Sequence, residues 1–310
     1  MNKKFDLGVL TYFKNEGHVI HEWIHHYRKW GVQHIWLIDN GSSDNYDVQH
    51  FIDEGFVTVW KEPTLGQFQS YKKYIKIIKQ KVHWLGVFDM DEFLYSKEYP
   101  TITDVIHSIQ SLYKVKTTPL HMIEIQMRIF LPSTFKSPAS VVQSNTVVKQ
   151  MDSAKHPKCL YNMNYIQNVT IHGDGLHIPS QNRYFIDGNQ SILCINHYRY
   201  GSFEYIYGIK EGRGGGVHRE KYKRHMILDS TDSDIDTSYT TDSFLKDHSD
   251  IWRQHVHPCV DLYPKSSWLF LKKNIPDKYD EFCLMNDDKT LSVKQIHEIG
   301  IFFYEIFKKM

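Results

Sequence analysis

Two aspartates separated by a single residue, Asp89 and Asp91, follow directly on the apolar run of residues 84–88. In an extended segment, alternate side chains project from the same face, so both carboxylates would meet one ligand. Such a pair suits a hard divalent cation, Mn²⁺ or Mg²⁺, whose coordination shell is completed by oxygens of a substrate diphosphate. The pair therefore predicts a metal and diphosphate site, in which the ion stabilises charge on a departing nucleoside diphosphate.

The position of this pair separates it from a chance match. A second pattern of alternating aspartates, in residues 232–236, lies in a polar tract that we interpret as a solvated loop. Asp89 and Asp91 instead follow a predicted buried strand. The alternative for these two carboxylates is that they cap a helix that begins after the strand.

Polar residues also follow two earlier predicted strands, at residues 5–13 and 34–38. Ligands of an open α/β sheet bind at the carboxyl ends of the strands, so these polar segments would converge on the site of the two aspartates. Their carboxylate and amide groups can exchange hydrogen bonds with a uridine- or guanosine-type base and its ribose. The predicted nucleotide ligands are Thr11, Asn15, Glu16, Asp39 and Asn40.

The elements that position these residues are predicted from hydrophobic periodicity. Four strands are predicted in the first part of the chain, at residues 5–13, 34–38, 56–60 and 84–88. Helices are predicted from near Glu16 to before Gly31 and over residues 67–81. This alternation indicates a parallel sheet covered by helices.

After about residue 115 the pattern changes to strand-like runs separated by long loops, at residues 122–130, 146–149 and 190–196. We therefore expect an α/β fold with a mixed, mainly parallel central sheet and a C-terminal helical appendage. The expected organisation is a catalytic domain at 1–228, with a nucleotide-binding part at about 1–115 and an acceptor part at about 116–228. An acidic linker or loop at 229–250 and a helical segment at 251–310 follow.

The composition limits the partners of the protein. A formal net charge of +1 over 310 residues gives no general attraction to nucleic acid. No run of eighteen apolar residues is present, so a membrane-spanning helix is not expected. We expect a soluble protein in the cytoplasm of a microbe or of a virus-infected cell, with at most peripheral membrane contact through the aromatic and lysine-containing residues 301–309. The alternative for that segment is packing on its own domain.

Several motifs in a fixed order resemble glycosyltransferase family 92 and related family-2-like transferases, over about residues 7 to 215. They are Lys14-Asn15-Glu16, Glu22-Trp23-Ile24, Gly31-Val32, Asp39-Asn40-Gly41-Ser42-Ser43-Asp44, Asp89-Met90-Asp91-Glu92-Phe93 and Asn196-His197-Tyr198. The resemblance implies a GT-A-type nucleotide-sugar-binding fold and a nucleotide-sugar donor, often UDP-galactose.

The resemblance also implies roles for single residues. Asp89 would face the ribose or the metal, and Asp91 would be the main metal ligand. His197 would complete the metal shell, Gln67 would lie near the nucleotide, and Lys158 would contact phosphate. The alternatives are a packed or surface histidine at His197 and a solvated lysine at Lys158.

The acceptor side of the site is less defined. An inverting transfer needs a base near the acceptor hydroxyl, and Glu124, His172, Asp174 and Glu211 all lie in plausible regions. Of these, Asp174 is our first candidate. The family's aromatic-glycine motif is absent from residues 128–134, so the resemblance does not extend to acceptor specificity. The glycine-rich, basic residues 212–224 are interpreted either as a lid over the donor or as an exposed loop.

The sequence thus predicts a metal-dependent hexosyltransferase that moves a sugar, with galactose as one possibility, from a UDP-sugar to a glycan, glycoprotein or glycolipid. One alternative is a sugar-phosphate nucleotidyltransferase, although the first strand is followed by residues 12–16 rather than by a glycine-rich phosphate loop. The other alternative is a carbohydrate-binding protein that retains the fold without turnover.

Overall fold

The computed structural model describes residues 3–115, 117–130, 141–144, 148–149, 157–170, 176–187, 192–199, 201–202, 205 and 235–236. The chain divides into two compact units. The first contains residues 1–128 and 152–196, and the second contains residues 129–151 and 197–310. The C-terminal helical appendage and most of the predicted acidic linker lie outside the described residues, and the domain boundaries given above stay predictions.

The first unit is built on a seven-stranded sheet in the order β10-β6-β9-β4-β1-β2-β3. Its strands are β1 (Phe5–Phe13), β2 (His34–Asp39), β3 (Val57–Lys61), β4 (Val82–Val87), β6 (Met122–Ile125), β9 (Lys158–Asn162) and β10 (Arg183–Ile186). The strands β4, β1, β2 and β3 are parallel neighbours, and β6 is parallel to β10. Only β9 runs against its neighbours in this sheet, β4 and β6. The prediction of a mixed, mainly parallel sheet is confirmed.

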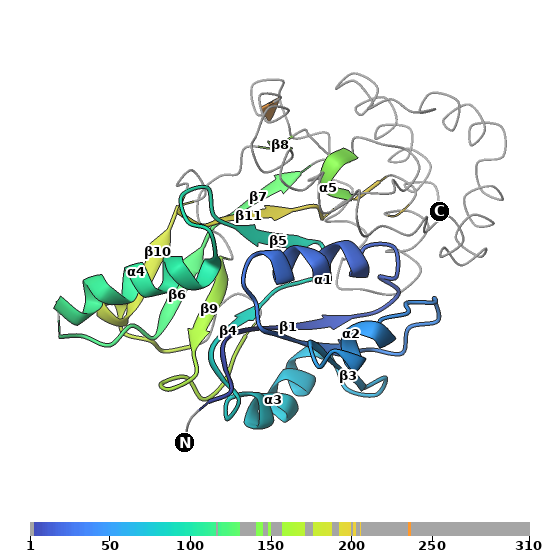
Figure 1. Cartoon of the computed structure of the whole chain (residues 1–310), viewed down its shortest axis with the longest axis horizontal. Helices are drawn as coiled ribbons and strands as arrows, with labels where there is room; N and C mark the ends of the chain where they lie inside the picture. The colour runs from blue at the N-terminus through green and yellow to red at the C-terminus, as the bar shows by residue number, and fades with distance from the viewer. Residues whose placement is uncertain are drawn as a thin grey trace, which may run out of the picture. The chain divides into compact units, whose positions relative to one another are not determined.

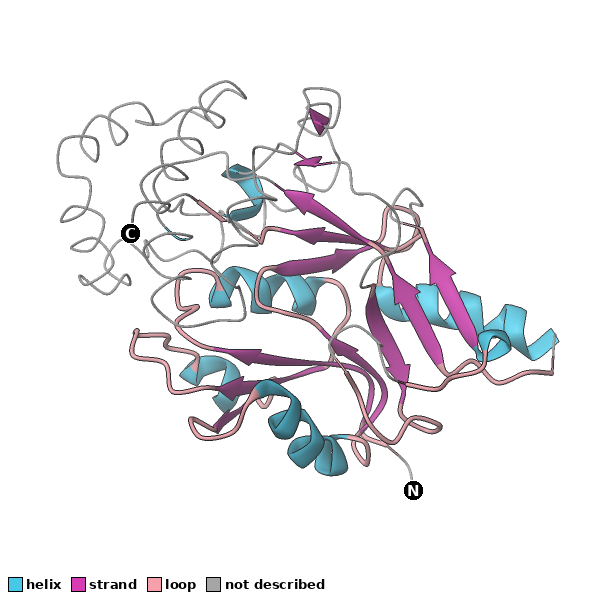
Figure 2. Ribbon diagram, turned by 180° about the vertical axis from the view of Figure 1, so that it is seen from behind, coloured by secondary structure: helices cyan, strands magenta, loops and turns pink. Residues whose placement is uncertain are grey.

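Helices cover this sheet. They are α1 (Ile20–Lys29), α2 (Gln49–Asp53), α3 (Gln67–Ile78) and α4 (Ile102–Val115), with the short 3-10 helix η1 (Ser180–Asn182) before β10. Two of them, α1 and α3, correspond to the helices that the alternating pattern predicts. Figure 1 shows α1 and α3 on opposite sides of the β4-β1-β2 part of the sheet, and Figure 2 shows the same layers from behind. Buried Tyr71 and Ile75 of α3 pack in one cluster with Leu10 and Trp36 of the sheet. Because the helices cover the faces of the sheet, the site is positioned by the carboxyl ends of its parallel strands.

Smaller strands complete the described structure. In the first unit, β5 (Glu92–Tyr95) lies beside β11 (Cys194–His197) in a second sheet. In the second unit, β8 (Val148–Lys149) pairs antiparallel with the end of β7 (Met127–Phe130) and with β12 (Ile235–Asp236), and α5 spans Val141–Ser144. None of the helices in the described ranges is long and apolar enough to cross a lipid bilayer.

Two predicted elements differ from the structure in their limits. The helix predicted from near Glu16 begins at Ile20, because Asn15 adopts a left-handed conformation with φ 56° and a turn follows it. The backbone N–H groups of Val19 and Ile20 both donate to Glu16 O, which closes this turn. The run predicted at 122–130 is divided at Gln126 into β6 and β7, which belong to different sheets. The N–H of Gln126 still donates to Ile186 O and forms the last bond of the β6–β10 ladder.

Candidate functional site

The predicted metal-binding motif forms a tight turn between β4 and β5. The N–H of Glu92 donates to Asp89 O at 3.1 Å, and the N–H of Asp89 donates to the Glu92 carboxylate at 3.0 Å. The two residues therefore close the turn reciprocally, as a capping box closes the start of a helix. The Asp89 side chain keeps 35% of its surface exposed, whereas that of Glu92 is fully buried. Asp89 is thus the carboxylate of this pair that a ligand can reach.

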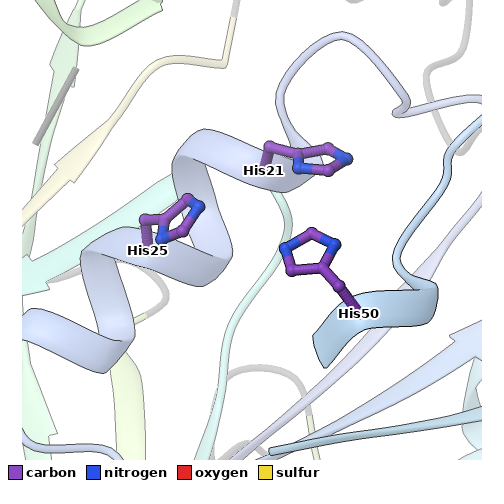
Figure 3. Close-up of side chains that lie close together, drawn as sticks. All are labelled: His21, His25 and His50. Carbon is purple, nitrogen blue, oxygen red and sulfur yellow. The ribbon is translucent and has the colours of Figure 1, made fainter. Parts of the chain in front are cut away.

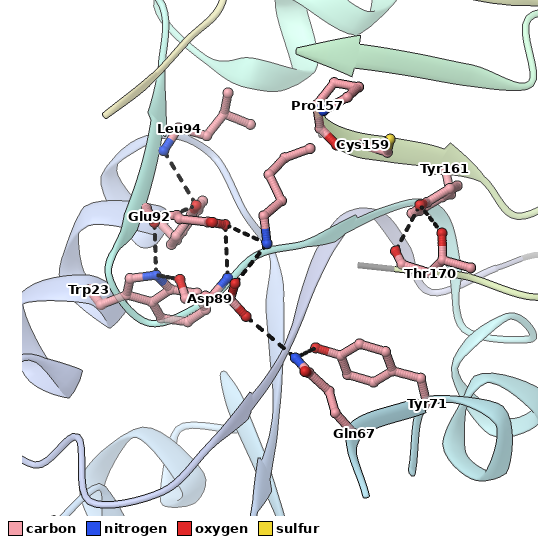
Figure 4. A network of polar contacts seen from close by, with 12 residues as sticks. Trp23, Gln67, Tyr71, Asp89, Glu92, Leu94, Pro157, Cys159, Tyr161 and Thr170 are labelled. Atoms are coloured by element: carbon pink, nitrogen blue, oxygen red, sulfur yellow. Dashed lines mark hydrogen bonds and ion pairs between the residues drawn. The ribbon is translucent and has the colours of Figure 1, made fainter. Parts of the chain in front are cut away.

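Helix α1 holds this turn from behind. The indole N–H of Trp23 donates to Glu92 O at 2.9 Å and to Asp89 O at 3.1 Å, as Figure 4 shows. The hydroxyl of Tyr27, one helical turn later, donates to Glu92 O at 3.0 Å. Trp23 and Tyr27 are both fully buried. The carbonyl groups at both ends of the turn are therefore fixed, which orients the carboxylates between them.

Lys158, the first residue of β9, places a buried ammonium group among these carboxylates. Its Nζ lies 2.8 Å from Asp89 Oδ2 and 3.0 Å from Glu92 Oε2. Strand β9 runs antiparallel to β4, with Cys159 opposite Val87, and this register brings Lys158 to the end of β4. Burial disfavours the ammonium form, but Asp89 and Glu92 outweigh that effect and raise the pKa of Lys158 above its usual value. Lys158 is therefore a permanently charged partner of both carboxylates.

The charges of the turn fit a divalent cation. Asp89, Asp91 and Glu92 supply three carboxylates within four residues, and Asp91 is 8% exposed. Against the single ammonium group of Lys158, a fully ionised turn carries a net charge of −2, since three negative charges meet one positive charge. Oxygen ligands with an excess of negative charge are the donors that Mg²⁺ and Mn²⁺ prefer. The residues present therefore fit the predicted ion.

Gln67, the first residue of α3, joins the same network. Its side-chain amide donates to Asp89 Oδ1 at 3.4 Å and to the hydroxyl of Tyr71 at 3.0 Å, as Figure 4 shows. Burial, together with the negative charge of Asp89, raises the pKa of Tyr71 above its usual value, so this hydroxyl stays protonated. Both carboxylate oxygens of Asp89 thus have a partner, one from Gln67 and one from Lys158.

The loops after β1 and β2 are bound to each other. Asn15 N–H donates to Ser42 Oγ at 2.9 Å, and Asn15 Oδ1 accepts from the N–H of Ser43 at 2.7 Å. The N–H of Asn40 donates to Phe13 O at 2.8 Å. The left-handed backbone of Asn15 is one that asparagine tolerates better than most residues. Asn15 and Asn40 therefore shape the edge of the sheet at which the predicted ligands of the nucleotide converge.

Asp39, the last residue of β2, is fully buried and anchors the loop that follows it. Its Oδ1 accepts from Ser42 N–H at 2.7 Å, and its Oδ2 accepts from Tyr46 Oη at 2.5 Å and from Lys61 Nζ at 2.6 Å. Burial opposes ionisation, but the donors Lys61, Tyr46 and Ser42 together lower the pKa of Asp39 below its usual value. Burial and the bond to Asp39 raise the pKa of Tyr46 to about 12.

The remaining predicted site residues lie in different surroundings. Thr11 is fully buried within β1, opposite Leu37 of β2, so its side chain occupies the core rather than the surface. Glu16, in the loop after β1, is 5% exposed, and its Oε2 lies 3.9 Å from His18 Nε2. His197 ends β11, the sheet neighbour of β5, and is the residue at which the second unit begins. Asp174 lies outside the described residues. The ligand roles of these four residues stay predictions.

Three residues of the turn network were not assigned by sequence reasoning. Glu92 was part of the recognised motif but received no role, although its position three residues after Asp89 is the spacing of a capping box. Trp23 belongs to one of the recognised motifs and Tyr27 to the helix predicted before Gly31, but neither received a role at the site. Because both carry a polar group, a buried position requires a hydrogen-bond partner for each of them, and that requirement was the available signal.

Solved structures with a similar arrangement show only weak likeness. One is S. aureus TarS 1–349 in complex with UDP, at 10% identity and a TM-score of 0.38, covering 70% of this chain and 68% of that one. Another is glucosyl-3-phosphoglycerate synthase from Mycobacterium tuberculosis, crystallised with Mn²⁺, UDP and glucosyl-3-phosphoglycerate. It is 14% identical with a TM-score of 0.27, covering 40% of this chain and 44% of that one.

Similarity in sequence is more informative. A glycosyltransferase family 92 protein of Ricinus communis is 25% identical over 237 residues, which cover 72% of this chain and 38% of the relative. A glycosyltransferase family 92 protein of Oryza sativa subsp. japonica is 26% identical over 220 residues, which cover 68% of this chain and 36% of the relative. The matches thus span little more than a third of these relatives. The model of one family, glycosyltransferase family 92, matches residues 9–242, which is most of the sequence, and the chain therefore belongs to that family.

Proposed function

We propose that this protein transfers a sugar from a nucleoside-diphosphate sugar, UDP-linked, to a hydroxyl group of a glycan, glycoprotein or glycolipid, with help from Mn²⁺ or Mg²⁺. The observation that carries the proposal is the turn of Asp89, Asp91 and Glu92 at the end of β4, closed against the buried ammonium of Lys158. Family membership supports the same reaction class. The galactosyl group is one candidate for the transferred sugar.

The residues of the turn would hold the ion in the following way. Asp91 would be the main ligand, Asp89 would bind either the ion or the ribose of the nucleotide, and His197 at the end of β11 would complete the coordination shell. When bound, the ion neutralises the diphosphate that leaves and orients it. Lys158 and Gln67 fix the rotamer of Asp89, because each donates to a different oxygen of its carboxylate. Lys158 also adds positive charge beside the phosphates.

The transfer itself is proposed to invert the configuration of the sugar. The acceptor oxygen forms a bond to the anomeric carbon while the bond from that carbon to the diphosphate oxygen breaks. A base takes the proton of the acceptor hydroxyl, and Asp174 is our candidate for this base. The loops of Asn15 and Asp39, which are tied together by Ser42 and Ser43, provide the surface for the base and the ribose of the nucleotide.

The test is release of nucleoside diphosphate from a panel of nucleotide sugars, with and without Mn²⁺, in wild type and in Asp91→Asn. We expect Mn²⁺-dependent release of UDP from a UDP-sugar. In Asp91→Asn the rate of release should decrease by at least about a hundredfold, which is the usual effect of removing one group that stabilises charge in the transition state. The matched control is Asp234→Asn, in the second pattern of alternating aspartates, which should behave as wild type.

Other outcomes separate the competing functions. A donor that binds in calorimetry but is neither hydrolysed nor transferred, with any acceptor tested, would support a carbohydrate-binding protein. Formation of a nucleotide sugar from a nucleoside triphosphate and a sugar phosphate would support a nucleotidyltransferase. If no nucleotide sugar binds, the proposal is wrong.

A further inference from the structure

Three histidines gather on the first unit, apart from the turn of Asp89. His21 and His25 lie one helical turn apart on α1, so their side chains share a face of the helix. His50 is the second residue of α2 and projects toward them, as Figure 3 shows. Each ring offers one nitrogen, and these three nitrogens all lie within 4.8 Å of one another. We call this group the histidine cluster.

The cluster lies against a buried aromatic ring. Phe51, next to His50 on α2, is fully buried, and the ring centroid of His25 lies 5.0 Å from its own. The His50 ring lies 3.8 Å from Phe51 and stacks on His21 at 5.7 Å with an interplanar angle of 23°. The cluster therefore lies where α1 meets α2, with the buried ring of Phe51 beside all three imidazoles.

The charges around the cluster do not prevent a cation from binding. Arg28 of α1, whose guanidinium lies over the same Phe51 ring at 5.1 Å, pairs with Glu54, so its charge is partly neutralised. His50 is exposed, and His21 and His25 are half-buried, so solvent reaches part of each of the three residues. No large desolvation cost therefore opposes entry of an ion.

We propose that His21, His25 and His50 bind a late first-row transition-metal ion, of which Zn²⁺ is the representative. Neutral imidazole is a good ligand for zinc, copper and nickel, whereas Mg²⁺ prefers oxygen. A tetrahedral Zn²⁺ site with bonds of about 2.0 to 2.1 Å separates its nitrogen ligands by about 3.4 Å. The present separations of up to 4.8 Å are wider, so binding requires the three side chains to rotate toward the ion, and a water molecule takes the fourth position.

Such an ion would fasten α1 to α2. Between β2 and α2 runs the loop that begins at Asp39 and is held to the β1 loop through Ser42 and Ser43. Trp23 and Tyr27, which hold the Asp89 turn, lie on the face of α1 opposite to His21 and His25, because residues two apart are about 200° apart around a helix. The ion would therefore stabilise the helix that positions the turn without touching the turn.

The experiment uses the full chain without a polyhistidine tag, titrated with Zn²⁺ in a calorimeter and with Co²⁺ in a spectrophotometer. Four-coordinate Co²⁺ bound by imidazoles absorbs visible light strongly, whereas six-coordinate Co²⁺ bound by oxygens does not, so the spectrum distinguishes this cluster from the carboxylate turn. We expect the strong absorption, and the Zn²⁺ site that accompanies it, in wild type and in Asp91→Asn. In His50→Ala we expect loss of the absorption and a decrease in Zn²⁺ affinity of more than about tenfold.

His107→Ala is the matched control, since His107 is an exposed helical histidine of α4 outside the cluster, and it should bind both ions as wild type does. Equal Zn²⁺ affinity and equal Co²⁺ spectra in His50→Ala and His107→Ala would overturn the proposal. Loss of the absorption in Asp91→Asn, with the absorption retained in His50→Ala, would also overturn the proposal. If His50→Ala does not fold, His25→Asn provides the same comparison. These readouts require no transferase activity, so they are independent of the proposed function.

Discussion

At the scale of single residues, Lys158 is the side chain on which the turn of carboxylates depends. A buried ammonium group is tolerated only when nearby negative charges compensate its lost hydration. Asp89 and Glu92 provide that compensation, and they in turn lie close together because Lys158 lies between them. The sequence could not show this arrangement, because Lys158 is 69 residues away from Asp89. From the sequence alone, a solvated lysine at this position was as plausible as one in the site.

Replacement of Lys158 by methionine should destabilise the protein by about 3 to 5 kcal/mol, because it removes one partner of a buried ion pair and leaves Glu92 without compensation. The measurement is urea unfolding followed by circular dichroism. Lys72→Met is the control, since Lys72 is exposed on α3, and its unfolding free energy should change by no more than about 0.5 kcal/mol. A loss below about 1 kcal/mol in Lys158→Met would contradict a buried ion pair.

The candidate site was partly predictable at this scale. Asp89 and Asp91 follow from their spacing and from the buried strand before them, and the structure places Lys158 and Gln67, two further predicted residues, in contact with Asp89. Glu92 and Trp23 were missed because their functions are to close and hold a turn. Such functions depend on backbone groups whose positions are known only after folding.

At the scale of elements, α1 combines two tasks on opposite faces. One face carries Trp23 and Tyr27 against the turn, and the other carries His21 and His25 against α2. The helix begins later than the predicted start near Glu16, because the loop before it is fixed by bonds to the β2 loop. The N–H of Gly17, for example, donates to Asp44 Oδ2 at 2.6 Å. Contacts between loops that are distant in sequence thus set the limits of an element that local periodicity predicts.

Replacement of Trp23 by phenylalanine tests whether α1 positions the turn. The change removes the indole N–H from Asp89 O and Glu92 O, but each carbonyl keeps another donor, from Glu92 N–H and from Tyr27 Oη respectively. We therefore expect a loss of only about 1 to 2 kcal/mol in stability together with weaker binding of donor and Mn²⁺. Calorimetric titration with UDP and Mn²⁺ measures the second effect.

The control for this prediction is Trp60→Phe. Trp60 stacks on Tyr74 at 4.2 Å on the other side of the sheet and makes no described contact with the turn. It should lose some stability through its smaller ring and bind UDP and Mn²⁺ as wild type does. Unchanged binding in Trp23→Phe would show that the turn keeps its shape without the indole.

At the scale of the whole molecule, the order of the sheet explains why fold class was predictable and topology was not. Strands β1 to β4 alternate with helices, and β1 was predicted with its observed limits, Phe5–Phe13. The antiparallel β9 and the helix α4 were not predicted, although Lys158 reaches the site only because β9 lies between β4 and β6. Pairing between strands more than sixty residues apart is not contained in local periodicity.

The last prediction concerns the stability of the folded protein in the presence of nucleotides. A ligand that binds only the folded state raises the free energy of unfolding by about 2.7 kcal/mol when its concentration is a hundred times its Kd. We therefore expect UDP with Mn²⁺ to raise the melting temperature more than GDP, CDP or ADP with Mn²⁺, in a thermal-shift series at equal concentrations.

The same series separates the nucleotide from the ion. In Asp91→Asn, the part of the UDP shift that requires Mn²⁺ should disappear, because the main proposed ligand of the ion has lost its charge, whereas Asp234→Asn should retain it. A larger shift with GDP would reassign the donor to a guanosine-linked sugar and leave the reaction class in place. If none of these nucleotides raises the melting temperature, there is no longer a reason to place a donor at the carboxyl edge of this sheet.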